Sequence, residues 1–336
     1  MADGGGSPRP LPAPRTAPVL RRNRRITAVP PDRREGLVRL CALDPVEGVS
    51  LAHQLTRWER WGRGDVVVTG TLDAPTAGAW ATGSLMVYGL APRPGLGHAG
   101  ADPQDVRALA DHARGRMVRR GAVSGPRRDV EAVWGPLSEA GLTAREARWN
   151  QPLLLAPRAA EGLLAAQLRR RPHLGWVGAG TRAAVPAEDA LVQPAAAAMF
   201  REEVGYDPAC SGRAFARHIS WLVGSGRGYV LLDDGQGGPA VPGDPAAVAF
   251  KADVGSLWRS PSGAVAQLTG VWTRPDLRGR GIGTVALAAV VDAVRADHVG
   301  PDGVVSLYAN DFNAPALGLY RSLGFTRHGT FATILL

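Results

Sequence analysis

The sequence predicts a chain of two consecutive α/β domains of the α+β type, and three observations lead to this fold class. At 336 residues the chain exceeds the usual size of one hydrophobic core. Its hydrophobic content of 45% is sufficient to fill two cores. Patterns typical of strands and helices also alternate through both halves of the sequence.

The first 35 residues are rich in glycine, proline and arginine, with almost no large apolar residue before Val19. Such a segment cannot bury enough surface to offset the entropy of ordering it, so a disordered tail is predicted. Residues 1–39 contain nine arginines against three acidic residues and therefore hold most of the net charge of +9. Arginine clusters can hold phosphates, but no aromatic residues are interleaved for base stacking. The tail therefore does not favour nucleic acid as a partner.

A first domain is predicted over residues 36–157. In chain order its patterns indicate a strand at 37–40, a helix at 45–58, strands at 66–71 and 79–90, helices at 103–114 and 128–137, and a closing strand at 144–155. The pair Asp102-Pro103 is typical of a helix start. Residues 158–180 are predicted to be a connecting helix and linker, with Pro172 ending the helix.

A second domain is predicted over residues 181–336. Its patterns indicate a strand at 181–185, helices after 186 and at 212–223, strands at 228–232, 246–254 and 265–273, a loop at 274–283, a helix at 284–298, a strand at 303–308, a helix at 313–323 and a last strand at 331–335. The loop at 274–283 is the most informative part of the chain.

The cysteines and the apolar runs limit the class of protein. Cys41 and Cys210 fall one in each half of the chain, with no metal-ligand spacing around them, so neither a disulfide nor a metal site is expected. No apolar run is long enough to cross a membrane, because residues 286–291 are followed by Asp292. The N-terminus lacks the apolar segment of a secretory signal. These features predict a reduced, cytoplasmic protein with no membrane partner.

A loop rich in arginine and glycine lies between a strand and an apolar helix, at residues 274–283. Glycines 279, 281 and 283 allow sharp turns and leave backbone N–H groups uncovered. These amides and the positive end of the following helix form an anion site. A pyrophosphate suits this site, and Arg278 and Arg280 add positive charge.

Two common phosphate-binding motifs fit this loop less well. A P-loop would end in Gly-Lys-Ser/Thr, which is absent. The pattern Gly281-x-Gly283-x-x-Ala286 does match one form of the dinucleotide fingerprint. That fingerprint, however, opens a large parallel sheet and needs an acidic residue about 20 positions further on, at the end of the next strand. Neither condition is met here.

Two motifs resemble those of the GCN5-related N-acetyltransferase (GNAT) family. The segment Arg278-x-x-Gly281-x-Gly283 is similar to the family's Q/R-x-x-G-x-G/A loop, which wraps the pyrophosphate of coenzyme A. Thirty residues later, the segment 313–325 matches each position of the family pattern N-x-x-A-x-x-L-Y-x-x-x-G-F. Asn313 and Tyr320 are two helical turns apart and so share one helix face. The resemblance covers about 155 residues.

The resemblance implies a GNAT fold, in which helices flank a mixed, mostly antiparallel sheet. It implies acetyl-CoA as the acyl donor, bound where the strand at 265–273 separates from the strand at 303–308. The residues expected to bind it are Val271, Trp272, Thr273, Arg278, Gly279, Arg280, Gly281, Ile282, Gly283, Thr284 and Asn313. A backbone N–H near Val271 would donate to the thioester carbonyl. Tyr320 is the expected catalytic acid for the departing thiolate, or else only a hydrogen-bond donor to its sulfur.

The residue that accepts the amine proton is not identified by the sequence. Many family members use a glutamate on the strand before the loop, but residues 264–273 contain no carboxylate. Glu202 and Glu203 lie on an early helix expected to border the acceptor site. Asp253 and His218 are further candidates, and an acceptor that arrives as a neutral amine is equally compatible.

The first predicted domain is similar to the front half of the same fold but contains neither motif. The whole chain therefore resembles a tandem arrangement in which a degenerate, smaller GNAT-like domain precedes a competent one. The expected function is transfer of an acetyl group to a primary amine of a small molecule or protein by direct attack in a ternary complex. The alternative is a non-catalytic acyl-CoA sensor. An RNA-modifying enzyme guided by the basic tail is a third hypothesis, and the chain is expected to be a monomer or a homodimer.

Overall fold

The computed structural model describes residues 25–241 and 246–336 of the chain. The predicted disordered tail lies outside the described residues as far as position 24. The prediction that this tail extends to residue 35 is wrong. Strand β1 (Ile26–Ala28) pairs with strand β2 (Val66–Gly70), and Val29 is buried beside it. Two apolar side chains among the arginines, Ile26 and Val29, are what attach this segment to the first core.

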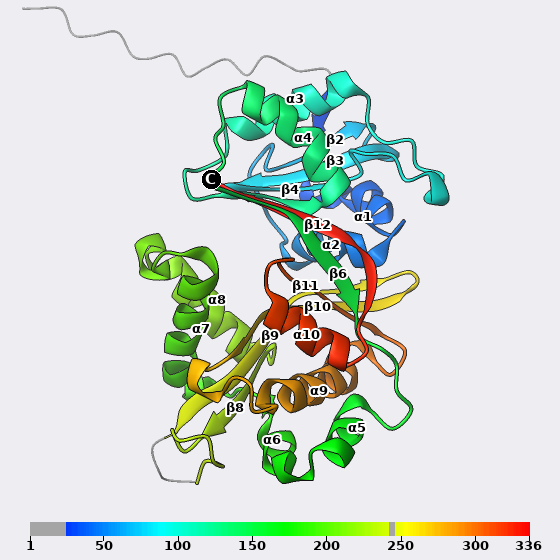
Figure 1. Cartoon of the computed structure of the whole chain (residues 1–336). Helices are drawn as coiled ribbons and strands as arrows, with labels where there is room; N and C mark the ends of the chain where they lie inside the picture. Colours follow the sequence, from blue (N-terminus) through cyan, green and yellow to red (C-terminus); the bar gives the residue numbers. More distant parts are fainter. Residues whose placement is uncertain (1–24, 242–245) are drawn as a thin grey trace, which may run out of the picture.

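The chain forms two lobes that repeat one order of elements: a strand, two helices, three strands, a helix, a strand, a helix and a strand (Figure 1). The first lobe contains β1, α1 (Glu35–Cys41), α2 (Pro45–Arg57), β2, β3 (Pro75–Thr82), β4 (Ser84–Tyr88), α3 (Pro103–Arg114), β5 (Ala122–Pro126), α4 (Arg127–Glu139) and β6 (Glu146–Leu155). The second contains β7 (Arg182–Ala183), α7 (Asp189–Val204), α8 (Arg213–Gly224), β8 (Gly228–Asp233), β9 (Ala247–Ser260), β10 (Gly263–Thr273), α9 (Ile282–Val294), β11 (Val304–Tyr308), α10 (Ala314–Ser322) and β12 (Thr326–Leu335). Helices α5 (Leu163–Arg170) and α6 (Gly175–Gly180) connect the lobes.

All of these strands belong to one sheet, in the order β1-β2-β3-β4-β5-β12-β6-β11-β10-β9-β8-β7. The order is symmetric, because each lobe places its last strand against the fifth strand of the other lobe. Strand β12 pairs with β5, and β6 pairs with β11. The last strand of each lobe is thus exchanged into the other lobe. These two exchanged strands, β6 and β12, pair with each other at the centre of the sheet. Only β4–β5 and β10–β11 are parallel among the described pairs, so the prediction of a mixed, mostly antiparallel sheet is confirmed.

Helices cover both faces of the sheet in each lobe (Figure 1). In the first lobe α3 and α4 pack on one face and α1 and α2 on the other. In the second lobe α9 lies on one face, where α5 and α6 pack against it, and α7 and α8 lie on the other. Helix α9 has almost no exposed residue, because it is enclosed between the sheet and the connecting helices. This enclosure fixes the position of the loop that precedes it.

The first lobe differs from the sequence prediction in four places, and two of these are strands that were not predicted, β1 and β5. Residues 37–40, predicted as a strand, belong to helix α1, since Leu37, Leu40 and Cys41 are buried at helical spacing. The predicted strand 79–90 is two strands that turn back at Gly83, whose φ of +81° is accessible mainly to glycine. The remaining predicted elements agree with the structure to within a few residues, except that β7 is shorter and β12 begins earlier, at Thr326.

Cys41 is buried and Cys210 exposed, and both are free. No cluster of three or more potential metal ligands occurs in residues 25–241 and 246–336. In the same residues, no helix is both long and apolar enough to span a bilayer.

Candidate active site

A cleft opens in the second lobe where two parallel strands separate. Strands β10 and β11 are paired from Val265 with Val304 as far as Leu268 with Leu307, and the described pairing ends there. Beyond this point β10 continues to Thr273 with one extra residue in its pairing with β9, which is a β-bulge at Gly270 and Val271. Between the separated strands lies a cleft of about 860 Å³. The prediction that the site opens between these strands agrees with this geometry.

The cleft brings together almost all of the residues predicted from the motifs. Its lining includes Val271, Trp272, Thr273, Arg278, Gly279, Arg280, Gly281, Gly283, Thr284, Asn313 and Tyr320. Ile282 is the exception, because its side chain is buried in the core beneath α9. Ile282 can therefore offer only its backbone N–H.

The glycines of the loop are required by close approaches as well as by turns. Gly279 and Gly281 have φ of +77° and +81°, and Gly281 is the N-cap of α9. A Cβ on Gly283 would lie 2.6 Å from the Thr273 hydroxyl oxygen, so only glycine lets α9 begin this close to β10. The first N–H groups of a helix have no partner within the helix. Gly281 and Gly283 line the cleft at this helix start, where an anion can accept from such groups.

Positive charge at this end of the cleft comes from two parts of the chain. Arg278 and Arg280 line the cleft, as predicted. Arg278 also donates to the Thr273 carbonyl (2.9 Å) and forms an ion pair with Glu202 (2.6 Å). Arg171 and His173, at the end of the connecting helix, line the cleft too. Sequence reasoning missed these two because they follow no motif and were assigned to a linker.

Tyr320 projects from α10 into the other end of the cleft and is 5% exposed. Its ring packs at 5.7 Å from that of Phe325. Burial, together with the negative charge of Glu203, raises the pKa of the Tyr320 phenol. The phenol therefore stays protonated at neutral pH. Asn313 is the N-cap of α10, and its side-chain oxygen accepts from the Ala316 N–H (3.2 Å), which accounts for the three-residue spacing between these two motif positions.

The four candidate proton acceptors have different surroundings. Glu202 is held by Arg278 and by the Trp272 indole N–H (3.1 Å). Asp253 is paired with Lys251, whose ammonium is fully buried (2.5 Å). His218 has a lowered pKa because burial disfavours its charged form. Glu203 lines the cleft with its side chain 49% exposed, and desolvation of the carboxylate within the cleft raises its pKa although Arg148 lies 3.7 Å away.

Lys251 also fixes the backbone of the cleft. Its ammonium donates to the Gly270 carbonyl (3.2 Å) at the bulge of β10. A Cβ on Gly270 would lie 2.7 Å from the Asp253 carboxylate and 2.9 Å from the Lys251 nitrogen. This buried pair therefore determines the orientation of the peptide unit between Gly270 and Val271, whose N–H was predicted to contact the substrate carbonyl.

The comparisons with known proteins agree with this geometry. Residues 198–325 match the family model described as the acetyltransferase (GNAT) family. These residues form a GNAT acetyltransferase domain. Residues 92–173 match a second family, described as a domain of unknown function (DUF4081). No curated protein matches the chain.

Solved structures resemble the chain over both lobes. An X-ray structure of a Drosophila protein covers 93% of this chain and 98% of its own, with 10% identity and a TM-score of 0.51, which shows a shared fold. A tandem GNAT protein from the clavulanic acid biosynthesis pathway covers 92% and 98%, with 16% identity and a TM-score of 0.49. A GCN5-related N-acetyltransferase from Sphaerobacter thermophilus covers 92% and 95%, with 15% identity and a TM-score of 0.48.

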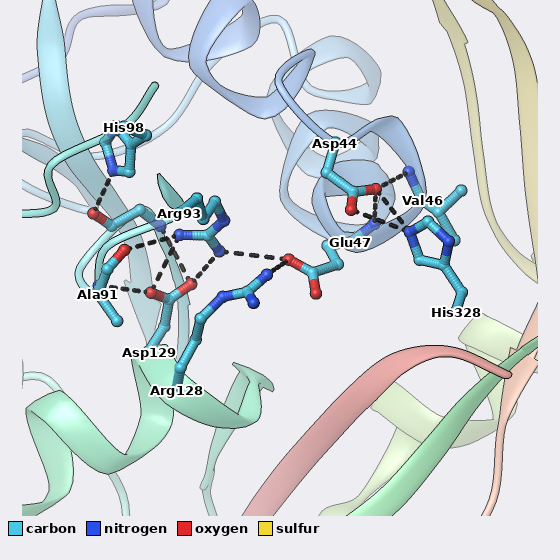
Figure 2. Close-up of polar contacts among 10 residues, drawn as sticks. Asp44, Val46, Glu47, Ala91, Arg93, His98, Arg128, Asp129 and His328 are labelled. Atoms are coloured by element: carbon cyan, nitrogen blue, oxygen red, sulfur yellow. Dashed lines mark hydrogen bonds and ion pairs between the residues drawn. The ribbon is translucent and has the colours of Figure 1, made fainter. Parts of the chain in front are cut away.

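The first lobe repeats the topology of the GNAT domain, but its corresponding cleft is closed. Where β4 ends, the N–H groups of Gly89 and Ala91 donate to Asp129 at 3.1 and 2.7 Å (Figure 2). The same carboxylate pairs with Arg93 at 2.6 Å, and Arg93 lies over the Tyr88 ring at 4.2 Å. The hollow that remains beside β4 and β5 measures about 50 Å³. The first lobe is thus GNAT-like and degenerate, as predicted.

Proposed function

We propose that this chain is an acetyl-CoA-dependent N-acetyltransferase that transfers an acetyl group to a primary amine by direct attack in a ternary complex. The observation that carries the proposal is the single cleft of the GNAT domain. It joins a glycine loop at the start of α9, a free strand edge at Val271 to Thr273, and a buried tyrosine. An acyltransferase needs all three, for the donor's phosphates, its amide chain and its leaving group respectively.

The residues of the loop fit the pyrophosphate of coenzyme A. At Gly281 a Cβ would meet Arg171 at 3.2 Å, and at Gly283 it would meet the Thr273 hydroxyl at 2.6 Å, so only glycine allows this close packing where the start of α9 lines the cleft. Arg278, Arg280 and Arg171 supply the positive charge. The unpaired edge of β10 supports pairing of Val271 and Thr273 with the pantetheine amides, as an added strand would pair. Bound acetyl-CoA supplies the acyl group as an activated thioester.

Two groups of the cleft support the chemical step, the Val271 N–H and the Tyr320 phenol. The Val271 N–H, held by the Lys251 contact to Gly270, donates to the thioester carbonyl oxygen as negative charge develops on it. The amine nitrogen bonds to the carbonyl carbon and the carbon–sulfur bond breaks. Tyr320 donates its proton to the departing sulfur. Burial keeps the phenol protonated before the step but also raises its pKa, so the transfer depends on its placement next to the sulfur.

Glu203 is the group that best suits the amine proton. It lies in the same cleft as Tyr320, and its pKa is raised toward the range useful to a base at neutral pH. The carboxylates of Glu202 and Asp253 are already engaged by cationic partners at 2.6 and 2.5 Å. The 3.7 Å contact with Arg148 is longer, so the carboxylate of Glu203 remains available.

Binding of the donor is tested by thermal unfolding with and without acetyl-CoA. At 100 times its dissociation constant, acetyl-CoA should stabilise the protein by about 2.7 kcal/mol. In Gly283→Val the new side chain displaces the Thr273 contact and obstructs the start of α9, so this shift should be greatly reduced. Gly115→Ala, at a glycine whose Cβ has room, is the matched control and should keep the full shift.

Turnover is tested by release of free coenzyme A in the presence of primary amines. Glu203→Gln should lower the rate and remove the acidic limb of its pH profile, because activity should rise with pH as this carboxyl loses its proton. Acetyl-CoA binding without transfer to any amine would contradict the proposed enzyme and favour the alternative, an acyl-CoA sensor.

A further inference from the structure

A basic and aromatic cluster lies where the two lobes meet, on the sheet face covered by α7 and α8. The first lobe contributes His53 and Arg57 from α2. The second contributes Trp221 from α8 and Arg227 from the turn before β8. The guanidinium carbon of Arg57 lies 3.5 Å from the centre of the Trp221 ring, and that of Arg227 lies 5.0 Å from the same centre. One indole therefore holds two guanidinium groups, one from each lobe.

These two positive charges have no carboxylate partner. No ion pair within residues 25–241 and 246–336 includes Arg57 or Arg227. Burial lowers the pKa of both groups, and the charge of Arg57 lowers that of Arg227 further. Arg93, Arg148 and Arg274, by contrast, each meet a carboxylate within 2.8 Å. A contact that only joined the lobes would gain nothing from a second like charge.

The hydrogen-bonding edges of both arginines are largely free. Stacking on an indole uses the face of a guanidinium and leaves its N–H groups in the plane available. Arg57 donates no hydrogen bond to any described residue, and Arg227 donates one side-chain bond, to His53 Nε2 (3.4 Å). His53 accepts there because its Nδ1–H donates to the Leu257 carbonyl (3.0 Å), and its pKa is lowered to about 4, chiefly by burial. A neutral His53 thus orients Arg227 without compensating its charge.

His53, Arg57, Trp221 and Arg227 do not line the cleft themselves, but a series of contacts leads from them to its reacting end. The His218 ring stacks on Trp221 at 6.0 Å, and the Asp253 charge acts on His218. Asp253 in turn pairs with Lys251, which contacts the Gly270 carbonyl. The neighbouring helix α7 supplies Met199 and Glu203 to the cleft wall. The cluster therefore lies on the side of the sheet from which Glu203 and Met199 face the cleft, which is the side proposed for the acceptor.

We propose that Arg57 and Arg227, stacked on Trp221, bind an anionic group of the acceptor, so that the enzyme prefers amines that carry a carboxylate or a phosphate. This inference rests on the proposed function and names the acceptor class that the proposal leaves open. Guanidinium forks match the oxygens of both anions. The site is formed by both lobes, which gives the degenerate lobe a part in substrate choice.

The test compares three primary amines that differ at one end, β-alanine, O-phosphoethanolamine and the neutral β-alaninamide. In the wild-type chain, kcat/KM should be at least about tenfold higher for the preferred acid than for the amide, because hydrogen bonds to ionised groups are the strong ones. The double variant Arg57→Gln, Arg227→Gln should lose this preference while its rate with β-alaninamide stays within about threefold. The two acids distinguish a carboxylate site from a phosphate site. Arg217→Gln, an exposed position on α8, is the matched control and should keep the wild-type preference.

Three results would overturn the inference. One is equal use of acid and amide by the wild-type chain, and another is a preference for amines that carry a second positive charge. The third is an equal loss for all three amines in the double variant, which would mean that the arginines only join the lobes. If acetyl-CoA binds but no amine is acetylated, the proposed function fails instead. In that case the anion site is tested by adding inorganic phosphate to the acetyl-CoA complex. Phosphate should raise the unfolding midpoint of the wild type but not that of the double variant.

Discussion

The two lobes of this chain have the same topology, but the place that forms an open cleft in the second lobe is filled by side chains in the first. After β10 the backbone edge is free, and a cleft of about 860 Å³ lies beside it. After β4 the corresponding N–H groups of Gly89 and Ala91 are bonded to Asp129, and only about 50 Å³ remains. Gly125 brings β5 so close to Val87 that a Cβ would lie 2.5 Å from the Val87 carbonyl oxygen.

The difference shows how a ligand site becomes a structural core without a change of fold. In the first lobe a side-chain carboxylate occupies the backbone donors that the GNAT domain leaves open. Arg93, 3% exposed, then neutralises this carboxylate and reaches Glu47 as well, at 3.5 Å (Figure 2). The closed lobe therefore no longer has a free donor set at the end of β4. Its remaining contributions are to the sheet, through the exchanged strand β6, and to the acceptor side, through residues such as Arg148.

The largest effect is expected for Tyr320→Phe, which should lower kcat by about 10² to 10⁴, the usual contribution of a positioned acid. The affinity for acetyl-CoA should change little, since the ring is retained. Tyr88→Phe in the first lobe removes a buried hydroxyl with no described partner and should leave kcat unchanged. Steady-state rates of coenzyme A release measure both. Equal losses in the two variants would mean that the lobes do not differ in this way.

A loss of stability comes next, for Asp129→Asn. This change leaves the buried charge of Arg93 without its nearest partner and should lower the free energy of unfolding by about 3–5 kcal/mol. Asp302→Asn, at an exposed ion pair of the second lobe with a 3.7 Å contact, should cost less than about 1 kcal/mol. Denaturant unfolding measures both values. The folded Asp129→Asn protein should still bind acetyl-CoA normally, and loss of that binding would show that the first lobe participates directly in donor binding.

The smallest effect concerns the contact between His328 of β12 and Asp44 of α2, at 2.9 Å (Figure 2). The hydrogen bond to Asp44 raises the pKa of His328 above 6.5, although burial opposes this. Burial acts to raise the pKa of Asp44, but His328 and two backbone N–H groups outweigh it and the pKa falls below 3.8. The contribution of His328 is therefore present below pH 6.5 and lost as pH rises through its folded pKa. That of Asp44 is present above pH 3.8 and lost as pH falls.

The pair should thus stabilise the exchanged strand most between about pH 4 and 6.5, by less than about 1 kcal/mol, because it is partly exposed. His328→Gln should flatten the decline of stability between pH 6 and 8. Unfolding midpoints of the wild type and the variant, measured across that pH range, give the two declines. An unchanged decline in the variant would mean that another group is responsible.

The sequence by itself determined the GNAT domain, the position of its cleft and most of the lining. These depend on local signals, because Gly281, Gly283 and Asn313 are required by turns, close approaches and caps within a few residues of themselves. Element order was predicted less completely, because strands β1 and β5, the short helix α1 and the turn at Gly83 were missed. These segments contain too few apolar residues to show a clear period, and packing decides their structure. The sequence also located the degenerate lobe, because the loop and helix motifs are simply absent there.

Only the tertiary structure decided which strands exchange and which distant residues complete the site. Strand pairing depends on partners that lie 151 to 155 residues apart for β6 with β11 and 205 to 213 residues apart for β12 with β5, so no local pattern selects them. Arg171 and His173 reach the cleft because α5 and α6 pack on α9, a contact that leaves no periodic signal. Arg57 and Arg227 both stack on the Trp221 ring because the exchange of β6 and β12 brings α2 into contact with β9 and β10 of the other lobe. Local chemistry fixed what each residue can do, and long-range packing determined which residues act together.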